Sequence, residues 1–485
     1  MTVKNIIFTL VIFTLLTGCS RSLDGFFSAK SDTKSVDQIA NLKQLANDGH
    51  VDSMYNLGYF YHEGLLVKQN YKEGIKWFKR AAKHDHVYAQ YALGAMYFQE
   101  EILGVDITEV NLKTNIFTID GTEVVEGDYT KAFGWFKLAA DQGLAEAQNN
   151  LGAMYSKGLG VEKNDQEAIK WWKLAAEQDL SLAQYNLGFL SYTGTQEMTQ
   201  SYSEANKWLR MAAEQGSSPS QYLLGVMYSK GEGVTQDYKE AEKWWKLAAG
   251  QGEQSAQLQL GMMYYNGTTG PQNYKAAHKW LNLAALQGDM MAQYNLGLMY
   301  NNGEGVDKNI PEAFKWWRRA AEYGFAKAQF NLSIMYYNGD GVGQSFERAF
   351  FWMKTAAQNN LAKAQYLLAH TYIGGNEYVD IDMLEAFMWM KKAAQNNYPG
   401  AKNDVGYLYQ SGDGGEQSYE KAIDLNPNFA EAHNNLGNVL KELGQMGDAV
   451  KSYQKAIVIN PNFAEAHNNL GNVFKDLNQF NDAIK

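Results

Sequence analysis

A six-residue phrase that recurs at a nearly constant interval constrains this chain more than any other feature of its sequence. Most copies resemble AQYNLG, and ten copies end, in order, at Gly58, Gly94, Gly152, Gly188, Gly225, Gly261, Gly297, Ser333, Ala369 and Gly406. The spacing is the same to within one residue, apart from one much longer step between Gly94 and Gly152. A fixed period of this kind is typical of an array in which each unit packs only against its neighbours.

A second phrase alternates with the first and has the spacing of a half-buried helix. One copy, EAIKWWKLAAEQ, begins at Glu167. Its alanines and tryptophans fall at i, i+3, i+4, i+7 and i+8, which form one helical face: Ala168, Trp171, Trp172, Ala175 and Ala176. All 12 tryptophans of the chain stand in copies of this phrase. We therefore expect them to be core residues that bridge successive helix pairs.

Residues that tolerate a left-handed backbone stand where each second helix is expected to end. They are Gly143, Gly216, Gly252, Gly288 and Gly324, with Asn360 and Asn397 in later copies. Glycine and asparagine are the usual residues just beyond a helix, because they adopt positive φ readily. The loop inside a pair, such as YSKGLGVEKND from Tyr155, is rich in glycine and turn-forming residues. Each repeat is therefore predicted to be two helices joined by a glycine-rich loop.

The combined pattern A-x-x-x-L-G-x-x-Y, a glycine loop and A-x-x-W-x-x-x-A-A resembles the Sel-one-like repeat family, which is related to tetratricopeptide repeats. About ten such repeats account for residues 35–410. The resemblance implies an all-α fold, a right-handed superhelical solenoid of helix-turn-helix repeats. It also implies a role in scaffolding or recognising other proteins.

The C-terminal segment repeats with a different and shorter period. The sequence NPNFAEAHNNLGNV occupies residues 426–439 and recurs without change at residues 460–473. This spacing, with Asn-Pro between helix pairs, resembles a tetratricopeptide repeat. We expect residues 411–485 to be tetratricopeptide repeats, the last of them incomplete.

The long step between Gly94 and Gly152 contains an insertion at about residues 100–127. Valine and isoleucine are interspersed there with polar residues, and the dipeptide Asp120-Gly121 favours a type I′ turn. We expect a small β-hairpin that projects from the loop between paired helices. Insertions in repeat arrays often lie on a functional face. The alternative is a neutral addition to the array.

The N-terminus has the features of an exported lipoprotein. Lys4 precedes an apolar run from Ile6 to Leu16, which is too short to span a membrane and suits a signal peptide. The following Leu-Thr-Gly-Cys resembles the bacterial lipobox. We therefore predict a signal peptide at residues 1–18, lipidation of Cys19 and an N-terminal tether at residues 19–34. Ser20, rather than aspartate, after the cysteine favours the outer membrane of a bacterial envelope.

Composition and missing motifs exclude several classes of function. A net charge of −10 disfavours a nucleic-acid partner, and a single cysteine rules out an intramolecular disulfide. The sequence has no phosphate-binding loop, H-E-x-x-H or G-x-S-x-G. Among the histidines only His84 and His86 are close together, and we interpret them as turn residues. We expect no catalytic residue, no metal site, no cofactor and no enzymatic activity.

The best candidate for a partner-binding site is a column of asparagines, each just before the leucine of the first phrase. Its members are Asn56, Asn150, Asn186, Asn295, Asn331, Asn435 and Asn469. The resemblance to tetratricopeptide arms places this column in a concave groove, where amides can hold the backbone of an extended peptide. Neighbouring tyrosines, among them Tyr185 and Tyr294, would add contact area. The alternative is that these asparagines form hydrogen bonds inside the array.

Three classes of function remain from the sequence. The first is a lipid-anchored scaffold that binds peptide or protein partners in its groove. The second is a cell-envelope enzyme of the β-lactam or penicillin-binding type, which the absent motifs disfavour. The third is a structural assembly factor for envelope machinery. The sequence identifies no particular partner.

Overall fold

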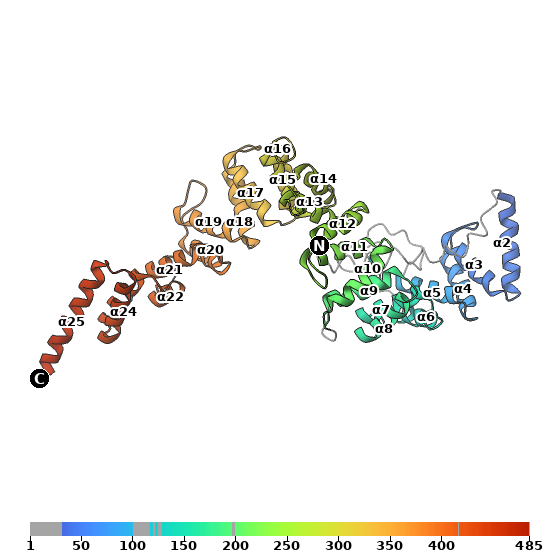
Figure 1. The fold of residues 1–485 in the computed structure, drawn as a ribbon, viewed down its shortest axis with the longest axis horizontal. Coiled ribbons are helices and arrows are strands. Elements are labelled where there is room, and N and C mark those ends of the chain that lie inside the picture. The colour runs from blue at the N-terminus through green and yellow to red at the C-terminus, as the bar shows by residue number, and fades with distance from the viewer. Residues whose placement is uncertain are drawn as a thin grey trace. The chain divides into compact units, whose positions relative to one another are not determined.

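The computed structural model of the chain consists mainly of helices packed in pairs (Figure 1). It describes residues 32–99, 117–119, 122–124, 129–195, 199–415 and 417–484. The predicted signal peptide, Cys19 and most of the predicted tether lie outside these residues. The chain divides into two compact units, one ending at Ala256 and the other beginning at Gln257. No helix in the described ranges is long and apolar enough to cross a lipid bilayer.

Each pair has a first helix and a second helix, and α2 (Asp32–Asn47) precedes the first pair. The first helices are α3 (Val51–Glu63), α5 (Val87–Gln99), α7 (Ala145–Lys157), α9 (Ser181–Thr193), α11 (Ser218–Lys230), α13 (Gln254–Asn266), α15 (Met290–Asn302), α17 (Ala326–Asn338), α19 (Ala362–Gly374), α21 (Ala401–Ser411), α23 (Ala430–Glu442) and α25 (Ala464–Ile484). The second helices are α4 (Tyr71–Ala82), α6 (Tyr129–Asp141), α8 (Asp165–Ala176), α10 (Tyr202–Glu214), α12 (Tyr238–Gly250), α14 (Tyr274–Leu286), α16 (Ile310–Glu322), α18 (Phe346–Gln358), α20 (Met383–Gln395), α22 (Tyr419–Leu425) and α24 (Met446–Ile459). The predicted all-α solenoid of helix-turn-helix repeats is confirmed.

A short hairpin lies where the sequence predicts one, between α5 and α6. Its strands are β1 (Phe117–Ile119) and β2 (Thr122–Val124). They pair antiparallel, with Phe117 opposite Val124. The predicted turn residues Asp120 and Gly121 lie outside the described residues.

Capping residues define the two ends of the second helices. At the start of α8, the side chain of Asn164 accepts a hydrogen bond from the backbone N–H of Glu167 at 2.9 Å. Such a cap satisfies one of the amide groups that the first helical turn leaves without a partner. Beyond the helix ends, Gly216 has a φ of 94° and Asn360 a φ of 62°. The left-handed positions predicted from glycine and asparagine are therefore confirmed.

Within a pair, the glycine of the first phrase lets the two helices approach closely. A Cβ atom added to Gly225 would lie 2.3 Å from the indole of Trp245. The same indole donates a hydrogen bond from Nε1 to the backbone oxygen of Tyr222 at 3.1 Å. The glycine and the large ring opposite it are thus one packing unit.

Between pairs, the first tryptophan of the second phrase packs against the pair before it, as the clusters show for Trp135, Trp171, Trp208, Trp244, Trp316, Trp352 and Trp389. We call the first tryptophans of all copies of this phrase the bridging tryptophans; they are Trp77, Trp135, Trp171, Trp208, Trp244, Trp280, Trp316, Trp352 and Trp389. Trp171 of α8, for example, shares a buried cluster with Phe136 and Ala140 of α6. Trp244 is buried in the same way against Leu209 of α10. This packing agrees with the expectation that the tryptophans bridge successive pairs.

Candidate partner-binding surface

The predicted asparagine column lies in the middle of the first helices, but its members differ in exposure. Asn150, Asn186 and Asn295 are only 8%, 8% and 7% exposed. Asn56, Asn331, Asn435 and Asn469 are partly exposed. Only the second group can meet a partner without movement of the surrounding side chains. The binding role of the column stays a prediction.

Several of these amides bind other groups of the array. The Nδ2 of Asn186 donates to Oδ1 of Asn149, one repeat earlier, at 2.9 Å. The Nδ2 of Asn295 donates to the backbone oxygen of Met291 at 2.7 Å. Near the C-terminus, the Nδ2 of Asn469 donates to Oδ1 of Asn434 at 3.1 Å. Such bonds are predicted by the alternative interpretation of the column, in which the asparagines form hydrogen bonds inside the array.

The two predicted tyrosines also have partners inside the array. Burial raises the pKa of the Tyr185 hydroxyl, and the nearby carboxylate of Glu253 raises it further. Burial also raises the pKa of the Glu253 carboxyl, and hydrogen bonds with Ser255 oppose this shift. Burial raises the pKa of Tyr294 as well, and a side-chain hydrogen bond with Asn331 opposes that shift. Tyr294 is half-buried and joins Asn331 of the next repeat, so this pair is accessible from one side.

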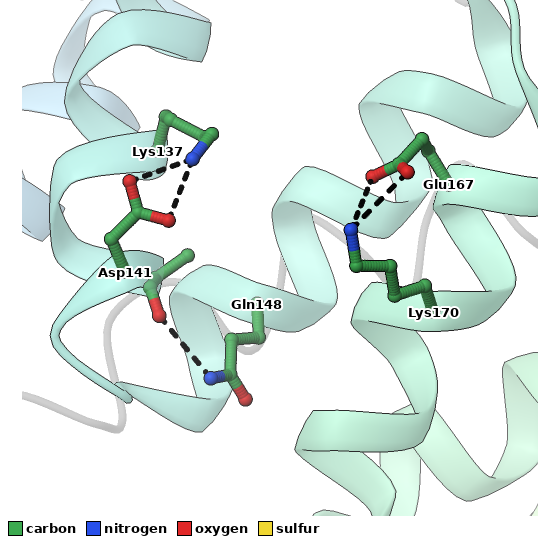
Figure 2. Close-up of polar contacts among 6 residues, drawn as sticks. Lys137, Asp141, Gln148, Glu167 and Lys170 are labelled. Atoms are coloured by element: carbon green, nitrogen blue, oxygen red, sulfur yellow. Dashed lines mark hydrogen bonds and ion pairs between the residues drawn. The ribbon is translucent and has the colours of Figure 1, made fainter.

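A second column, which the sequence analysis did not single out, is buried almost completely. It consists of the glutamines two residues before the asparagine column: Gln90, Gln148, Gln184, Gln221, Gln257, Gln293, Gln329 and Gln365. The Nε2 of Gln148 donates to the backbone oxygen of Ala140, in the preceding second helix, at 3.2 Å (Figure 2). Its Oε1 accepts from Nε2 of Gln178, at the end of the next second helix, at 2.9 Å. Gln90, Gln184, Gln221, Gln329 and Gln365 make the same two kinds of bond, so each of these glutamines joins the ends of two successive second helices.

We call this column of buried glutamines, together with its hydrogen bonds, the glutamine ladder. The ladder is interrupted at one place. The Oε1 of Gln293 is buried without a hydrogen-bond partner. The amide that should donate to it is replaced by Tyr323, which is 74% exposed. The phrase A-Q-x-x-L was visible in the sequence. The hydrogen bonds of its glutamines were not, because the residues that donate to them stand almost a full repeat further along the chain.

An apolar cavity of about 490 Å³ adjoins α17, α18 and α19 and the loop after α19. On its wall, the rings of Phe346 and Tyr378 are stacked with centroids 5.4 Å apart. Tyr337 and Tyr378 are 59% and 55% exposed. Exposed aromatic residues beside a cavity are typical of surfaces that contact a partner. The only sequence signal was the loop itself, which reads GGNEYVDID rather than the usual N-G-x-G-V.

His86 lies against an aromatic ring. Its ring stacks on Tyr55 with centroids 4.6 Å apart, and its Nε2 is 3.4 Å from the carboxylate of Asp52. Burial lowers the pKa of His86, and Asp52 opposes the shift. Throughout the described ranges, no group of three or more histidine, cysteine, aspartate or glutamate side chains could hold a metal ion.

Stacked helix pairs, bridging tryptophans and a buried amide ladder define a helical repeat protein. The sequence matches the Sel1 repeat at residues 51–86, 87–108, 119–144, 145–180, 181–217, 218–253, 254–289, 291–325, 326–361, 362–398 and 399–425. Two of these segments, 87–108 and 119–144, contain the two helices of one pair, α5 and α6, and the second segment also includes β2 of the hairpin. The chain belongs to the Sel1 repeat family. It also matches the tetratricopeptide repeat at residues 417–444 and 437–478.

Solved structures of the same fold agree with this assignment. The chain is similar to a protective antigen of uropathogenic Escherichia coli with an SLR fold: 29% identity, 90% coverage of each chain and a TM-score of 0.66. It is also similar to a Sel1 repeat protein from Oxalobacter formigenes, with 28% identity, coverage of 75% and 94%, and a TM-score of 0.50. A curated relative, the ERAD-associated E3 ubiquitin-protein ligase component HRD3B of Arabidopsis thaliana, is 26% identical over 136 residues. That match covers 28% of this chain and only 18% of the relative.

Proposed function

We propose that this chain is an exported, lipid-anchored scaffold that binds peptide or protein partners along the first helices of its repeats. The observation that carries the proposal is the repeat array itself, since Sel1 and tetratricopeptide arrays are typical of protein-interaction scaffolds. The half-exposed Tyr294–Asn331 pair and the exposed Tyr337 and Tyr378 support it, because they offer aromatic and amide contacts on the second unit. We place no nucleic acid among the partners, because the net charge is −10.

The proposed location is the bacterial outer membrane, with Cys19 as the lipidated residue. The lipobox-like Leu-Thr-Gly-Cys supports the anchor. The Escherichia coli relative is described as a protective antigen. An antigenic role in that relative supports a location at or near the cell surface for this chain.

Substitution of Cys19 by alanine is expected to release the chain from the membrane fraction. Each buried acyl CH₂ contributes about 0.8 kcal/mol to membrane binding, so removal of the acyl chains abolishes stable anchoring. The measurement is fractionation of the producing cells, with mass spectrometry of the N-terminal peptide. Ser20→Ala is the matched control and should stay lipidated. A Cys19→Ala chain that remains in the membrane fraction would disprove the anchor.

A photo-reactive side chain in place of Asn331 is expected to cross-link to a partner protein in intact cells. Position 331 is partly exposed and belongs to the proposed binding column. The same side chain in place of Lys315, whose own side chain is 66% exposed on α16, is the matched control. Adducts are identified by mass spectrometry. Equal adducts at both positions, or none at position 331, would contradict binding along the column.

A further inference from the structure

The bridging tryptophan is missing from the last two second helices, α22 and α24, and α22 lies where the Sel1 repeats meet the tetratricopeptide repeats. In the preceding pairs this tryptophan stands seven residues after the N-cap of the second helix, as Trp171 follows Asn164. Counting seven residues from Ser418, the N-cap of α22, gives Leu425. The helix ends there after 7 residues, whereas α8 has 12. Pro427 prevents α22 from continuing, because a proline disfavours the helical conformation of the residue before it and has no backbone N–H to donate.

A cavity of about 330 Å³ lies beside this shortened helix. We call it the junction cavity. Its lining residues are Lys391, Ala394 and Gln395 from α20, Lys402, Val405 and Tyr409 from α21, and Lys421, Asp424 and Leu425 from α22. Its size falls at the lower end of the range for ligand sites, which is about 300–1,000 Å³.

The register of the repeats shows what fills the equivalent space elsewhere. Ala394 of α20 holds the position that Ala140 holds in α6, five residues after the bridging tryptophan of its own helix. Ala140 is in a buried cluster with Trp171 of the next pair. At the junction, the residue that lies nearest in register to this indole is the smaller Leu425, which is only partly buried. The complete repeats therefore have an aromatic side chain in the space that corresponds to the junction cavity.

A lysine beside the cavity follows the same register. In α6, the Nζ of Lys137 lies 5.2 Å from the ring centroid of Trp171 in the next pair. Lys391 is the equivalent residue of α20, and α22 supplies no indole for it. Its Nζ instead lies 5.8 Å from the ring centroid of Phe387, in its own helix. A flexible lysine side chain can turn from that ring to one placed in the cavity.

The charges around the cavity are mainly positive. Lys391, Lys402 and Lys421 belong to the lining, and Asp424 is its one acidic residue. In a chain of net charge −10, this local excess of lysine complements an acidic partner.

We propose that the junction cavity binds an acidic peptide segment by taking up one aromatic side chain, for which tryptophan fits best. The aromatic ring lies against Ala394, Val405 and Leu425, with the Lys391 ammonium over its face. Lys402 and Lys421 pair with carboxylates on either side of the aromatic residue. This inference rests on the proposed scaffold function and gives it a partner of defined chemistry.

A second folded copy of this chain does not offer an exposed tryptophan, the side chain that fits the cavity best. All 12 tryptophans stand in second helices, and within the described ranges each is buried or half-buried by its own array. The occupant is therefore a segment of a different protein.

The test uses the purified full chain and a fluorescently labelled peptide with one tryptophan between aspartates and glutamates. Two matched peptides serve as controls, one with alanine in place of tryptophan and one with asparagine and glutamine in place of the acids. We expect the acidic tryptophan peptide to bind about tenfold or more tightly than either control, since a filled aromatic pocket and paired charges each contribute. If the alanine peptide binds as tightly, the proposal is overturned.

Two kinds of variant locate the binding site. Leu425→Trp restores the missing indole in the chain itself and should weaken peptide binding about tenfold, whereas Leu425→Met should leave it unchanged. Lys391→Gln should weaken binding several-fold, whereas Lys173→Gln, at the same register position of α8, should not. If Leu425→Trp does not fold, Lys402→Gln with Lys421→Gln decides the question. Affinity that survives all the junction variants would overturn the proposal.

This experiment and the cross-linking at position 331 can fail separately. Adducts at position 331 without peptide binding at the junction would reject the junction cavity as a site and leave the scaffold function standing. Peptide binding at the junction without adducts at position 331 would support the cavity and reject the asparagine column.

Discussion

Substitution of Gly225 by alanine is expected to destabilise the first unit by about 3 kcal/mol, because overpacking and a lost hydrogen bond add together. The added methyl would lie 2.3 Å from the Trp245 indole, a separation that real side chains do not adopt. The ring has to move, and its hydrogen bond to the backbone oxygen of Tyr222 is then lost. Urea unfolding of the full chain, with amide exchange in α11 and α12, measures the effect.

Gly250 supplies the matched control for this prediction. It also lies in a helix of the first unit, but an added Cβ would meet nothing within 4 Å. Gly250→Ala should therefore be neutral or stabilise by up to about 1 kcal/mol, the ordinary helix preference of alanine over glycine. If Gly225→Ala behaved like Gly250→Ala, the close packing of α11 on α12 would not be a source of stability.

The chain itself suggests a variant that restores stability. Where the glycine position holds a larger residue, as at Ser333 and Ala369, the residue opposite it is Met353 or Met390 rather than an aromatic ring. Methionine is unbranched and adapts to irregular space. The double variant Gly225→Ala with Trp245→Met should therefore be more stable than the sum of the two single effects predicts. Additive effects would show that the two residues are not coupled.

The sequence was sufficient to predict the repeat unit, because its signals are local. The constant period, the tryptophan face and the positive-φ residues each depend on one helix or one turn. Gly216 and Asn360 occupy the left-handed positions that their residue types predict. The hairpin between α5 and α6 was likewise visible from its alternating pattern.

The candidate site was harder to predict, because its properties depend on contacts between repeats. Asparagines with the same place in the phrase differ in exposure, since their neighbours in the next repeat differ. Asn186 bonds to Asn149 one repeat earlier, while Asn295 bonds to its own helix. The junction cavity depends on the loss of half a helix at Pro427, and the sequence showed the proline without showing what it leaves uncovered.

The glutamine ladder gives the second large effect, a loss of about 2 kcal/mol for Gln184→Leu, because a buried carbonyl loses a donor. Gln184 is fully buried, and its Nε2 donates to the backbone oxygen of Ala176 at 3.3 Å. Its Oε1 accepts from Nε2 of Gln215 at 2.8 Å. Leucine has a similar shape but restores neither bond. Thermal unfolding of the full chain measures the loss, and Gln215→Leu should cost less, about 1 kcal/mol, because it removes only the bond to Oε1 of Gln184 and keeps the bond from Gln184 to Ala176.

The interruption of the ladder at Tyr323 allows the reverse experiment. Tyr323→Gln should stabilise the second unit by about 1 kcal/mol, the usual net value of a buried hydrogen bond, because it gives the orphaned Oε1 of Gln293 a donor. Tyr323→Leu removes the same exposed ring without adding a donor and should not stabilise. If both variants gained equally, the cause would be the loss of an exposed tyrosine. If neither gained, the buried oxygen of Gln293 would carry no cost, and the ladder would position the repeats without stabilising them.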